Sequence, residues 1–442
     1  MSISSQPPSE LLTSVLAGLD RTRAVAEPGF IASRRERAAS WFRSNGLPQP
    51  KDERWRFTSL RPITKIPFAP AHAAALTPDQ EAAIDALLGA DTAYRVVVVN
   101  GRPLLPDASA PAGVEIGLLS QLRSAQRLEP YLGRSGIPHG FAALNTALFE
   151  DALVITVQRG ALVERPLHVV HVALSGEKPT LSYPRLLVIA EPQSALSLVE
   201  SHVEVGSEPH LASAVSEIFV EAGARLDHAL VHHGTPLAHR IAALEVHQEQ
   251  DSAYASRVVS LGGALTRLDL HATLDGRGTE CTLDGLYLAD GDEHVDHQTL
   301  VEHVAEHATS IQKYKGVLAG RAHAVFDGTV IVHKGAQHTN AHQENRNVLL
   351  SDEAIVNTKP HLEIDADDVR CSHGATIGQL DPAHVHYFRT RGIDAASARA
   401  ILSFAFAQEI VERIPSTELR ERVTSAVLER LPQGAIVREL FS

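Results

Sequence analysis

One cysteine and one histidine stand together on a glycine-rich stretch, CSHGATIGQLD, which runs from Cys371 to Asp381. Thiolate and imidazole are ligands that iron, zinc and copper prefer in proteins. In a strand, the i, i+2 spacing puts the side chains of Cys371 and His373 on one face. Two ligands do not close a tetrahedral site, so a partner chain or other histidines would have to supply the rest. The alternative is that Cys371 is a buried cysteine that packs as a small apolar side chain.

The sequence has one other cysteine, Cys281, in the segment GRGTECTLDG. We predict that Cys281 is a structural thiol at a turn or a strand edge. Cys281 and Cys371 are 90 residues apart, and two such cysteines make no disulfide framework. This favours a reducing compartment.

Histidine is abundant, with 24 residues in the sequence, half of them between His294 and His386. The pairs His294/His297 and His303/His307 have spacings that could hold zinc. No C-x-x-C motif accompanies them, so we favour histidines on outward-facing polar rungs of a β-structure.

The composition is that of an acidic globular protein, with 40 basic and 53 acidic side chains, a net charge of −13, and 44% hydrophobic residues. An acidic chain is not expected to bind nucleic acid or an anionic membrane surface as its main partner. The start, MSISSQPPSE, is no secretory signal, and no apolar run is long enough to cross a membrane. The sequence lacks a P-loop, an H-E-x-x-H and a G-x-S-x-G motif. We therefore expect a soluble cytoplasmic protein that is not a self-sufficient enzyme.

The periodicity of apolar residues changes twice along the chain. Helical spacing in the first 90 residues includes helices predicted over 11–19 and 32–42, after which KDERWRFTSL is expected to be extended. From about residue 94 to 370 the period is two, as where Leu268 and Leu270 alternate with Arg267 and Asp269. Apolar triplets at 330–332, 348–350 and 362–364 form a loose repeat with offsets of 18 and 14 residues. This favours a sandwich, a barrel or a β-solenoid.

The last part of the chain returns to helical spacing. Leu402, Phe406 and Ile410 lie on one i, i+4 row, which predicts an apolar helix face that packs on the β-region or docks a partner. We therefore divide the chain into an N-terminal helical domain (1–90), a β core (91–375) and a C-terminal helical domain (376–442).

Long motifs in this sequence resemble the SufB/SufD family. The segments CSHGATIGQLD, YFRTRGID and ARAILSFAFAQEI are similar to its C-terminal signature, and GLPQPKDERWRFTSL is similar to its N-terminal element. The segments DGLYLADGDEHVDHQTLVEH and GRAHAVFDGTVIV are similar to the family core. The cysteine-serine-histidine turn and the tryptophan-containing element are similar to the SufD members, and only two cysteines make a SufB member unlikely.

The resemblance implies a fold that is mainly β, with a right-handed parallel β-helix core between N-terminal and C-terminal helical domains. It implies a non-catalytic scaffold subunit for iron–sulfur cluster assembly. Such a subunit pairs with a SufB-like subunit through the β-helix core and docks a SufC-like ABC ATPase through the C-terminal helices, with Leu402, Phe406 and Ile410 as docking residues. A homodimer is an option for the isolated chain.

On matching positions, Cys371 and His373 would face a transient iron–sulfur cluster shared with the SufB-like subunit, with His373 as the favoured ligand. Sulfur would enter through that subunit from a cysteine desulfurase system, and not through Cys281. Some complexes of this kind bind reduced flavin, but no residue here identifies a flavin site.

Two other hypotheses stay open at this point. A metal-dependent β-helix enzyme acting on a polysaccharide would present carboxylates and aromatic rings along an open face, yet aromatic residues make up only 5% of the chain. A histidine-rich zinc-binding protein would hold several tightly bound zinc ions per chain.

Overall fold

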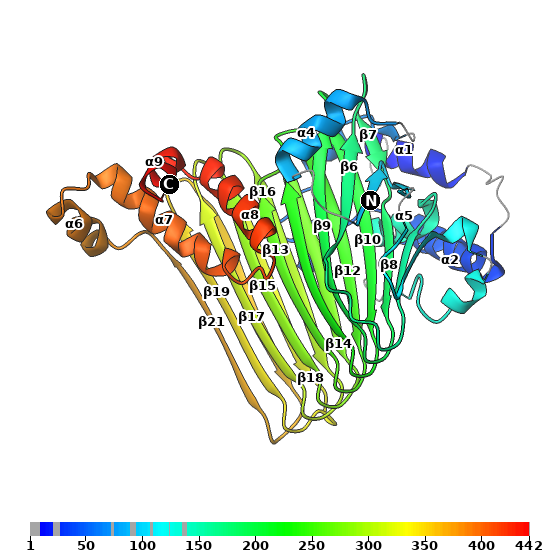
Figure 1. The fold of residues 1–442 in the computed structure, drawn as a ribbon. Helices are drawn as coiled ribbons and strands as arrows, with labels where there is room; N and C mark the ends of the chain where they lie inside the picture. Colours follow the sequence, from blue (N-terminus) through cyan, green and yellow to red (C-terminus); the bar gives the residue numbers. More distant parts are fainter. Residues whose placement is uncertain are drawn as a thin grey trace, which may run out of the picture.

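The centre of the molecule is a long β-solenoid, with N-terminal helices toward one end and C-terminal helices toward the other (Figure 1). This computed structural model describes residues 9–20, 27–71, 75–88, 94–106, 109–122, 124–134 and 139–441. In these ranges no helix is long and apolar enough to cross a membrane.

The helices within the described ranges are α1 (Glu10–Leu19), α2 (Gly29–Asn45), α3 (Arg61–Thr64), α4 (Pro78–Leu88), α5 (Gly140–Leu148), α6 (Pro382–Thr390), α7 (Ala395–Val411), α8 (Thr417–Arg430) and α9 (Gly434–Phe441), with 3₁₀ helices η1 (Glu53–Trp55), η2 (Leu119–Gln121) and η3 (Ala125–Leu128).

The strands of the same ranges are β1 (Ala69–Pro70), β2 (Arg95–Val99), β3 (Arg102–Leu104), β4 (Val114–Leu118), β5 (Leu153–Val157), β6 (Leu167–Leu174), β7 (Thr180–Ser182), β8 (Arg185–Ala190), β9 (Ala195–Val205), β10 (His210–Val220), β11 (Arg225–His233), β12 (Ala238–Gln248), β13 (Ala253–Leu261), β14 (Leu265–Leu274), β15 (Glu280–Ala289), β16 (His294–His303), β17 (Thr309–Leu318), β18 (His323–Val332), β19 (Asn340–Leu349), β20 (Ile355–Ile364) and β21 (Arg370–Gly378).

Strands β8 to β21 alternate between two sheets, so that each coil of the chain adds one strand to each sheet. Even-numbered strands from β8 to β20 form one sheet, and odd-numbered strands from β9 to β21 belong to the other. Neighbours in these runs pair in parallel. The prediction of a mainly β protein with a parallel β-solenoid core between terminal helices is confirmed.

The apolar repeat seen in the sequence has a direct structural meaning. Val330 of β18 lies in register with Leu362 of β20, while the triplet between them falls at the end of β19 in the opposite sheet, with Leu350 just beyond that strand. The two unequal offsets are therefore half-coils, which together make one full coil.

Alternate side chains of each strand point into the solenoid, as the pleat requires. Leu268 and Leu270 are almost fully buried there, which confirms the predicted apolar face. Arg267 and Asp269 on the polar face of the same strand are buried as well, because N-terminal elements cover them: Arg267 lies beneath the Trp55 ring, 3.8 Å from its centroid. Arg267 also donates to Asp269 and pairs with Asp296.

The tryptophan-containing segment is thus an anchor that holds the N-terminal helices on the solenoid. Thr58 of the same segment donates to Asp296 at 2.5 Å. The segment forms η1 and turns instead of the predicted extended chain, because the Trp55 ring must turn inward to cover the buried guanidinium. Helices predicted over 11–19 and 32–42 are confirmed as α1 and α2.

The C-terminal helices pack on the outer face of the second sheet. Ile410 of α7 and Val427 of α8 contribute to a buried apolar cluster with Val231, Val259 and Leu288 of β11, β13 and β15. Helix α6 has no buried residue and projects beyond the solenoid (Figure 1). The domain boundaries at 90 and 375 stay predictions. Helix α5, which lies inside the predicted core range, packs beside α2.

Candidate functional site at the open end of the solenoid

Cys371 and His373 lie on β21, the last strand of its sheet. The described residues include no strand that pairs with the outer edge of β21, or with the outer edge of β20 in the facing sheet. The last coil therefore leaves a row of unpaired backbone groups at the end of the solenoid, and such an edge is a template for another chain.

The register of β21 shows where its side chains point. Cys371 and His373 lie opposite Ala341 and Gln343 of β19, both of which are buried in the solenoid interior. The cysteine and the histidine therefore share the interior-facing side of the last strand, as their spacing predicted. Ser372 points the other way, 2.8 Å from His342 Nδ1.

The two side chains differ in their surroundings. Cys371 is half-buried and packs against the apolar interior, while His373 is exposed, because no coil within the described ranges covers this end. Burial raises the pKa of the Cys371 thiol above its ordinary value, although the backbone N–H of Ala341 acts in the opposite direction. A metal that binds here must displace the thiol proton, since only the thiolate is a good ligand.

A polar floor lies directly beneath His373. Gln343 and Gln312 follow His373 in register on β19 and β17, and both are fully buried. Gln343 Nε2 donates to Gln312 Oε1 at 3.3 Å, and Thr299 donates to the same oxygen at 2.9 Å. Gln343 Oε1 has no hydrogen-bond partner among the described residues. Sequence reasoning missed this floor, although its members recur at one-coil spacing.

Three large apolar side chains are exposed along these two strands. Ile355 and Ile364 at the two ends of β20 and Ile377 of β21 have exposed fractions of 55%, 42% and 46%, with exposed polar residues such as Lys359 and Arg370 between them. Exposed apolar side chains on an unpaired strand edge are typical of a surface that another protein covers.

Cys281 shares the interior column of Cys371 but lies three strands away. Ser310 and Ala341 separate the two cysteines in register on successive strands. Cys281 is almost fully buried, and burial raises the pKa of its thiol to about 12. This environment agrees with the structural thiol that we predicted.

The two histidine pairs whose spacing could hold zinc do not converge. His294 lies against the N-terminal segment on the outer face, whereas His297 is buried in the interior and meets Ser260. His303 is likewise buried in the interior, and His307 is exposed on a turn. A strand turns its side chains by half a circle per residue, so positions three apart face opposite ways. The expected outward rungs are thus wrong for His297 and His303.

The predicted docking row of α7 is only partly accessible. Ile410 is fully buried against the solenoid, while Leu402 and Phe406 are half-buried. Lys315 of β17 contacts this helix from the solenoid. Its ammonium lies 4.3 Å from the centroid of the Phe406 ring and donates to the Phe406 carbonyl at 3.1 Å. Ile410 therefore contributes to packing, and any partner would meet the remaining face of α6 and α7.

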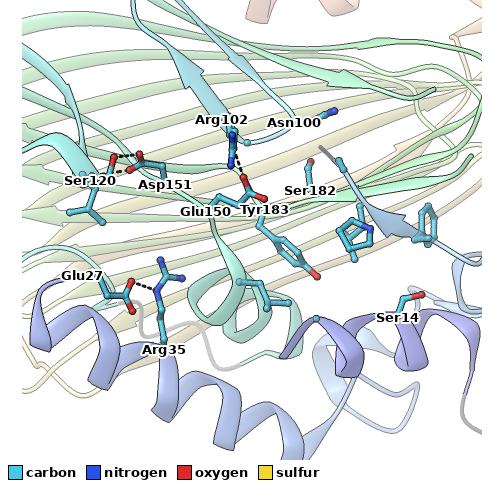
Figure 2. Close-up of a pocket in the computed structure, with 18 of the residues that line it drawn as sticks. Ser14, Glu27, Arg35, Asn100, Arg102, Ser120, Glu150, Asp151, Ser182 and Tyr183 are labelled. Carbon is cyan, nitrogen blue, oxygen red and sulfur yellow. Dashed lines mark hydrogen bonds and ion pairs between the residues drawn. The ribbon is translucent and has the colours of Figure 1, made fainter. Parts of the chain in front are cut away.

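A pocket of about 560 Å³ lies elsewhere, between the N-terminal helices and the solenoid (Figure 2). Its charged groups largely satisfy one another: Arg35 pairs with Glu27 at 2.8 Å, and Arg102 pairs with Glu150. The Tyr183 hydroxyl points into the open space. None of these lining residues indicates flavin binding, so the predicted flavin is not assigned to this pocket.

Comparison with known proteins identifies the family. The model of the SUF-system FeS cluster assembly SufBD core domain matches residues 172–406, and that of the SufBD N-terminal region matches residues 22–169. The chain belongs to the SufBD family. An iron–sulfur cluster assembly SufBD family protein of Synechocystis is 32% identical over 415 residues, covering 91% of each chain.

Two relatives carry the SufD name. The Escherichia coli iron–sulfur cluster assembly protein SufD is 32% identical over 400 residues, covering 88% of this chain and 90% of its own. The Bacillus subtilis SufD is 25% identical over 423 residues, covering 91% and 94%. The resemblance to the SufB/SufD family inferred from the motifs is confirmed.

Proposed function

We propose that this SufBD-family chain is a non-catalytic scaffold subunit of a SufBCD-type complex that assembles iron–sulfur clusters. In this proposal the open end of the solenoid pairs with a SufB-like subunit, and the C-terminal helices dock a SufC-like ATPase. A cysteine desulfurase system would deliver sulfur to the partner subunit. Any reduced flavin would bind elsewhere in the complex.

One observation carries the proposal: Cys371 and His373, two side chains of ligand type, share one face of a strand whose outer edge no described strand pairs with, and exposed isoleucines lie along that edge. A second chain that covers this edge would both pair with the backbone of β21 and bring further ligands to the cysteine and the histidine. A shared site also suits transfer, because a cluster that must leave is not held by four ligands from one chain. Imidazole at one position binds and tunes iron differently from thiolate.

The test is anaerobic co-expression with SufB-like and SufC-like partners, followed by assay of iron and acid-labile sulfide in the purified complex. His373→Ala should leave the complex assembled but lower its cluster content severalfold. His342→Ala is a matched control, since His342 is an exposed histidine on the neighbouring strand that faces the other way. Equal cluster content in wild type and His373→Ala would mean that this chain binds its partners but that His373 is no ligand of the cluster.

Two further variants separate the proposed interfaces. Ile377→Glu replaces an exposed apolar side chain of the last strand with a charged one and should weaken capture of the SufB-like subunit. Phe406→Glu disturbs α7 and should weaken capture of the ATPase. Each variant should keep the other partner in a pull-down. If both variants keep both partners, the proposed surfaces are wrong. A homodimer that withstands Ile377→Glu would show that like chains meet elsewhere.

A further inference from the structure

A second group of ligand-type side chains lies inside the solenoid, among its early coils. His171 of β6 and Glu200 and His202 of β9 each offer a nitrogen or oxygen atom, and these atoms lie within 4.8 Å of one another. Their exposed fractions are 6%, 0% and 7%. The group is remote from the end of the solenoid that carries Cys371, which lies several coils further along the sheet.

Strand geometry brings the three side chains together. Glu200 and His202 are two residues apart on β9, so both point into the interior. His171 of the adjacent strand lies in register with His202, and His232 of β11 continues the same row on the other side. Parallel strands lie about 4.8 Å apart, which places side chains in register within reach of one ion.

The Glu200 carboxylate is the centre of the group. His171 Nε2 lies 3.1 Å from its Oε2 atom, and His202 Nε2 lies 3.7 Å from the same oxygen. Its other oxygen, Oε1, lies 3.0 Å from His228 Nε2. Ser216 donates to Oε2 at 3.4 Å. One carboxylate is therefore surrounded by three imidazoles in a place without solvent.

The hydrogen bonds of this group are incomplete. Among the described residues, His171 Nδ1 is a buried polar atom without a hydrogen-bond partner, while Glu200 Oε1 and His228 Nε2 meet only each other, without good hydrogen-bond geometry. Leaving buried polar atoms unpaired costs about 1–3 kcal/mol each.

We propose that His171, Glu200 and His202 bind one divalent first-row cation, of the Zn²⁺ or Fe²⁺ type, inside the solenoid. Imidazole and carboxylate are the donors that such cations take. In this arrangement Glu200 Oε2 is the ligand atom, and His228 holds the other oxygen and so orients the carboxylate. This resident site is separate from the transient cluster proposed at Cys371 and His373, and its test does not depend on that function.

The metal-free arrangement predicts what must move. The rings of His171 and His202 are stacked, with centroids 4.4 Å apart and planes 4° from parallel. Arg240 Nη2 donates to His202 Nε2 at 3.2 Å. Since a ligand's ring plane contains the metal, binding must splay the two rings and displace the guanidinium from His202. Arg240 is therefore a competitor of the cation, and Arg240→Met should tighten cation binding.

The test uses the full chain, stripped of metal with a chelator and titrated with Co²⁺, whose visible d–d bands report ligand number and type. Wild type should bind one equivalent of Co²⁺ with bands that Zn²⁺ abolishes. His171→Gln and His202→Gln should each weaken this binding at least tenfold. His228→Gln should weaken it about 10- to 100-fold while keeping the band positions, as expected of a positioning residue.

His168→Gln is the matched control, because His168 is a buried histidine of the same strand β6 that meets Ser201 instead of Glu200. It should leave the cobalt bands unchanged. The proposal is overturned if His171→Gln and His202→Gln keep the wild-type bands, since cobalt would then lie on exposed histidines. Should those variants fail to fold, the wild type still decides. A titration without a one-equivalent phase, or a melting temperature that Zn²⁺ leaves unchanged, would overturn the site.

Discussion

At the open end of the solenoid, Cys371 and His373 lie two residues apart on the inward side of β21; among the early coils, Glu200 and His202 have the same spacing and direction on β9. In the part of the chain that the structure describes, no coil lies beyond the first pair, and the imidazole of His373 is exposed. The second pair is enclosed, with Glu200 fully buried among three histidines.

The difference lies in position along the solenoid and not in local geometry. A side chain that points inward in the middle of the stack must find its partners within the chain, because water cannot reach it. A side chain that points inward at the last coil can instead contact a second protein chain. We therefore expect Glu200 and His202 to contribute to the stability of the fold, and Cys371 and His373 to be able to bind and release a ligand.

The largest expected effect is on stability in the interior. Glu200→Ala removes the carboxylate that the surrounding histidines contact, leaves their buried nitrogen atoms without this partner, and should lower the free energy of unfolding by about 1–3 kcal/mol. Urea unfolding followed by circular dichroism measures this. Glu363→Ala, at an exposed carboxylate of the last coil, should change it by no more than about 0.5 kcal/mol. A loss below about 1 kcal/mol in Glu200→Ala would mean that the interior group is not structurally important.

The next effect is a dependence on pH that comes from the interior. Burial lowers the pKa of His303 to about 4 and that of His297 to about 3, below the value near 6.5 of an unfolded chain. The unfolded chain therefore binds more protons between pH 6.5 and 4, and stability falls as the pH is lowered through this range.

The slope should reach about 1.4 kcal/mol per pH unit for each such histidine. Urea unfolding at pH 7.5 and at pH 5 measures it. His303→Asn should lower the loss of stability between the two pH values, even if it destabilises the protein at both. An unchanged pH dependence in this variant would contradict the assignment.

A smaller effect is expected in the reaction rates of the two cysteines. Cys371 is half-buried at the open end, whereas Cys281 is enclosed. Both thiols have raised pKa values, so both should react slowly with iodoacetamide at neutral pH. Cys371 should nevertheless react at least about tenfold faster in the folded protein, because Cys281 needs an opening of the coil. Mass spectrometry of Cys281→Ser and Cys371→Ser follows each thiol alone, and equal rates would mean that the end is covered.

The smallest effect on stability is expected at His373, the residue with the main proposed role in cluster binding. His373→Ala should change the free energy of unfolding by no more than about 0.5 kcal/mol, since the side chain is exposed and buries no contact. Thermal unfolding of the isolated chain measures this. A large drop in melting temperature would make His373 a structural residue and would remove it from the proposed half-site.

Much of the architecture could be read from local patterns. The alternation around Leu268 and Leu270 predicted strands, and the apolar triplets contained the half-coil spacing. The i, i+2 spacing of Cys371 and His373 predicted their common face. The polar floor at Gln343 and the contact of His171 with Glu200 and His202 were missed, because these residues come from different strands and only the register of the sheets brings them together.

The sequence by itself determined the period of each segment, the family-like motifs and which side chains share a face of their own strand, since these follow from spacing along one chain. Only the tertiary structure decided which faces are enclosed. Arg267 sits on a polar face that the N-terminal anchor buries, and His373 sits on an inward face that stays open. The physical reason is that burial depends on what packs above a side chain, and in a solenoid that neighbour lies a full coil away or does not exist.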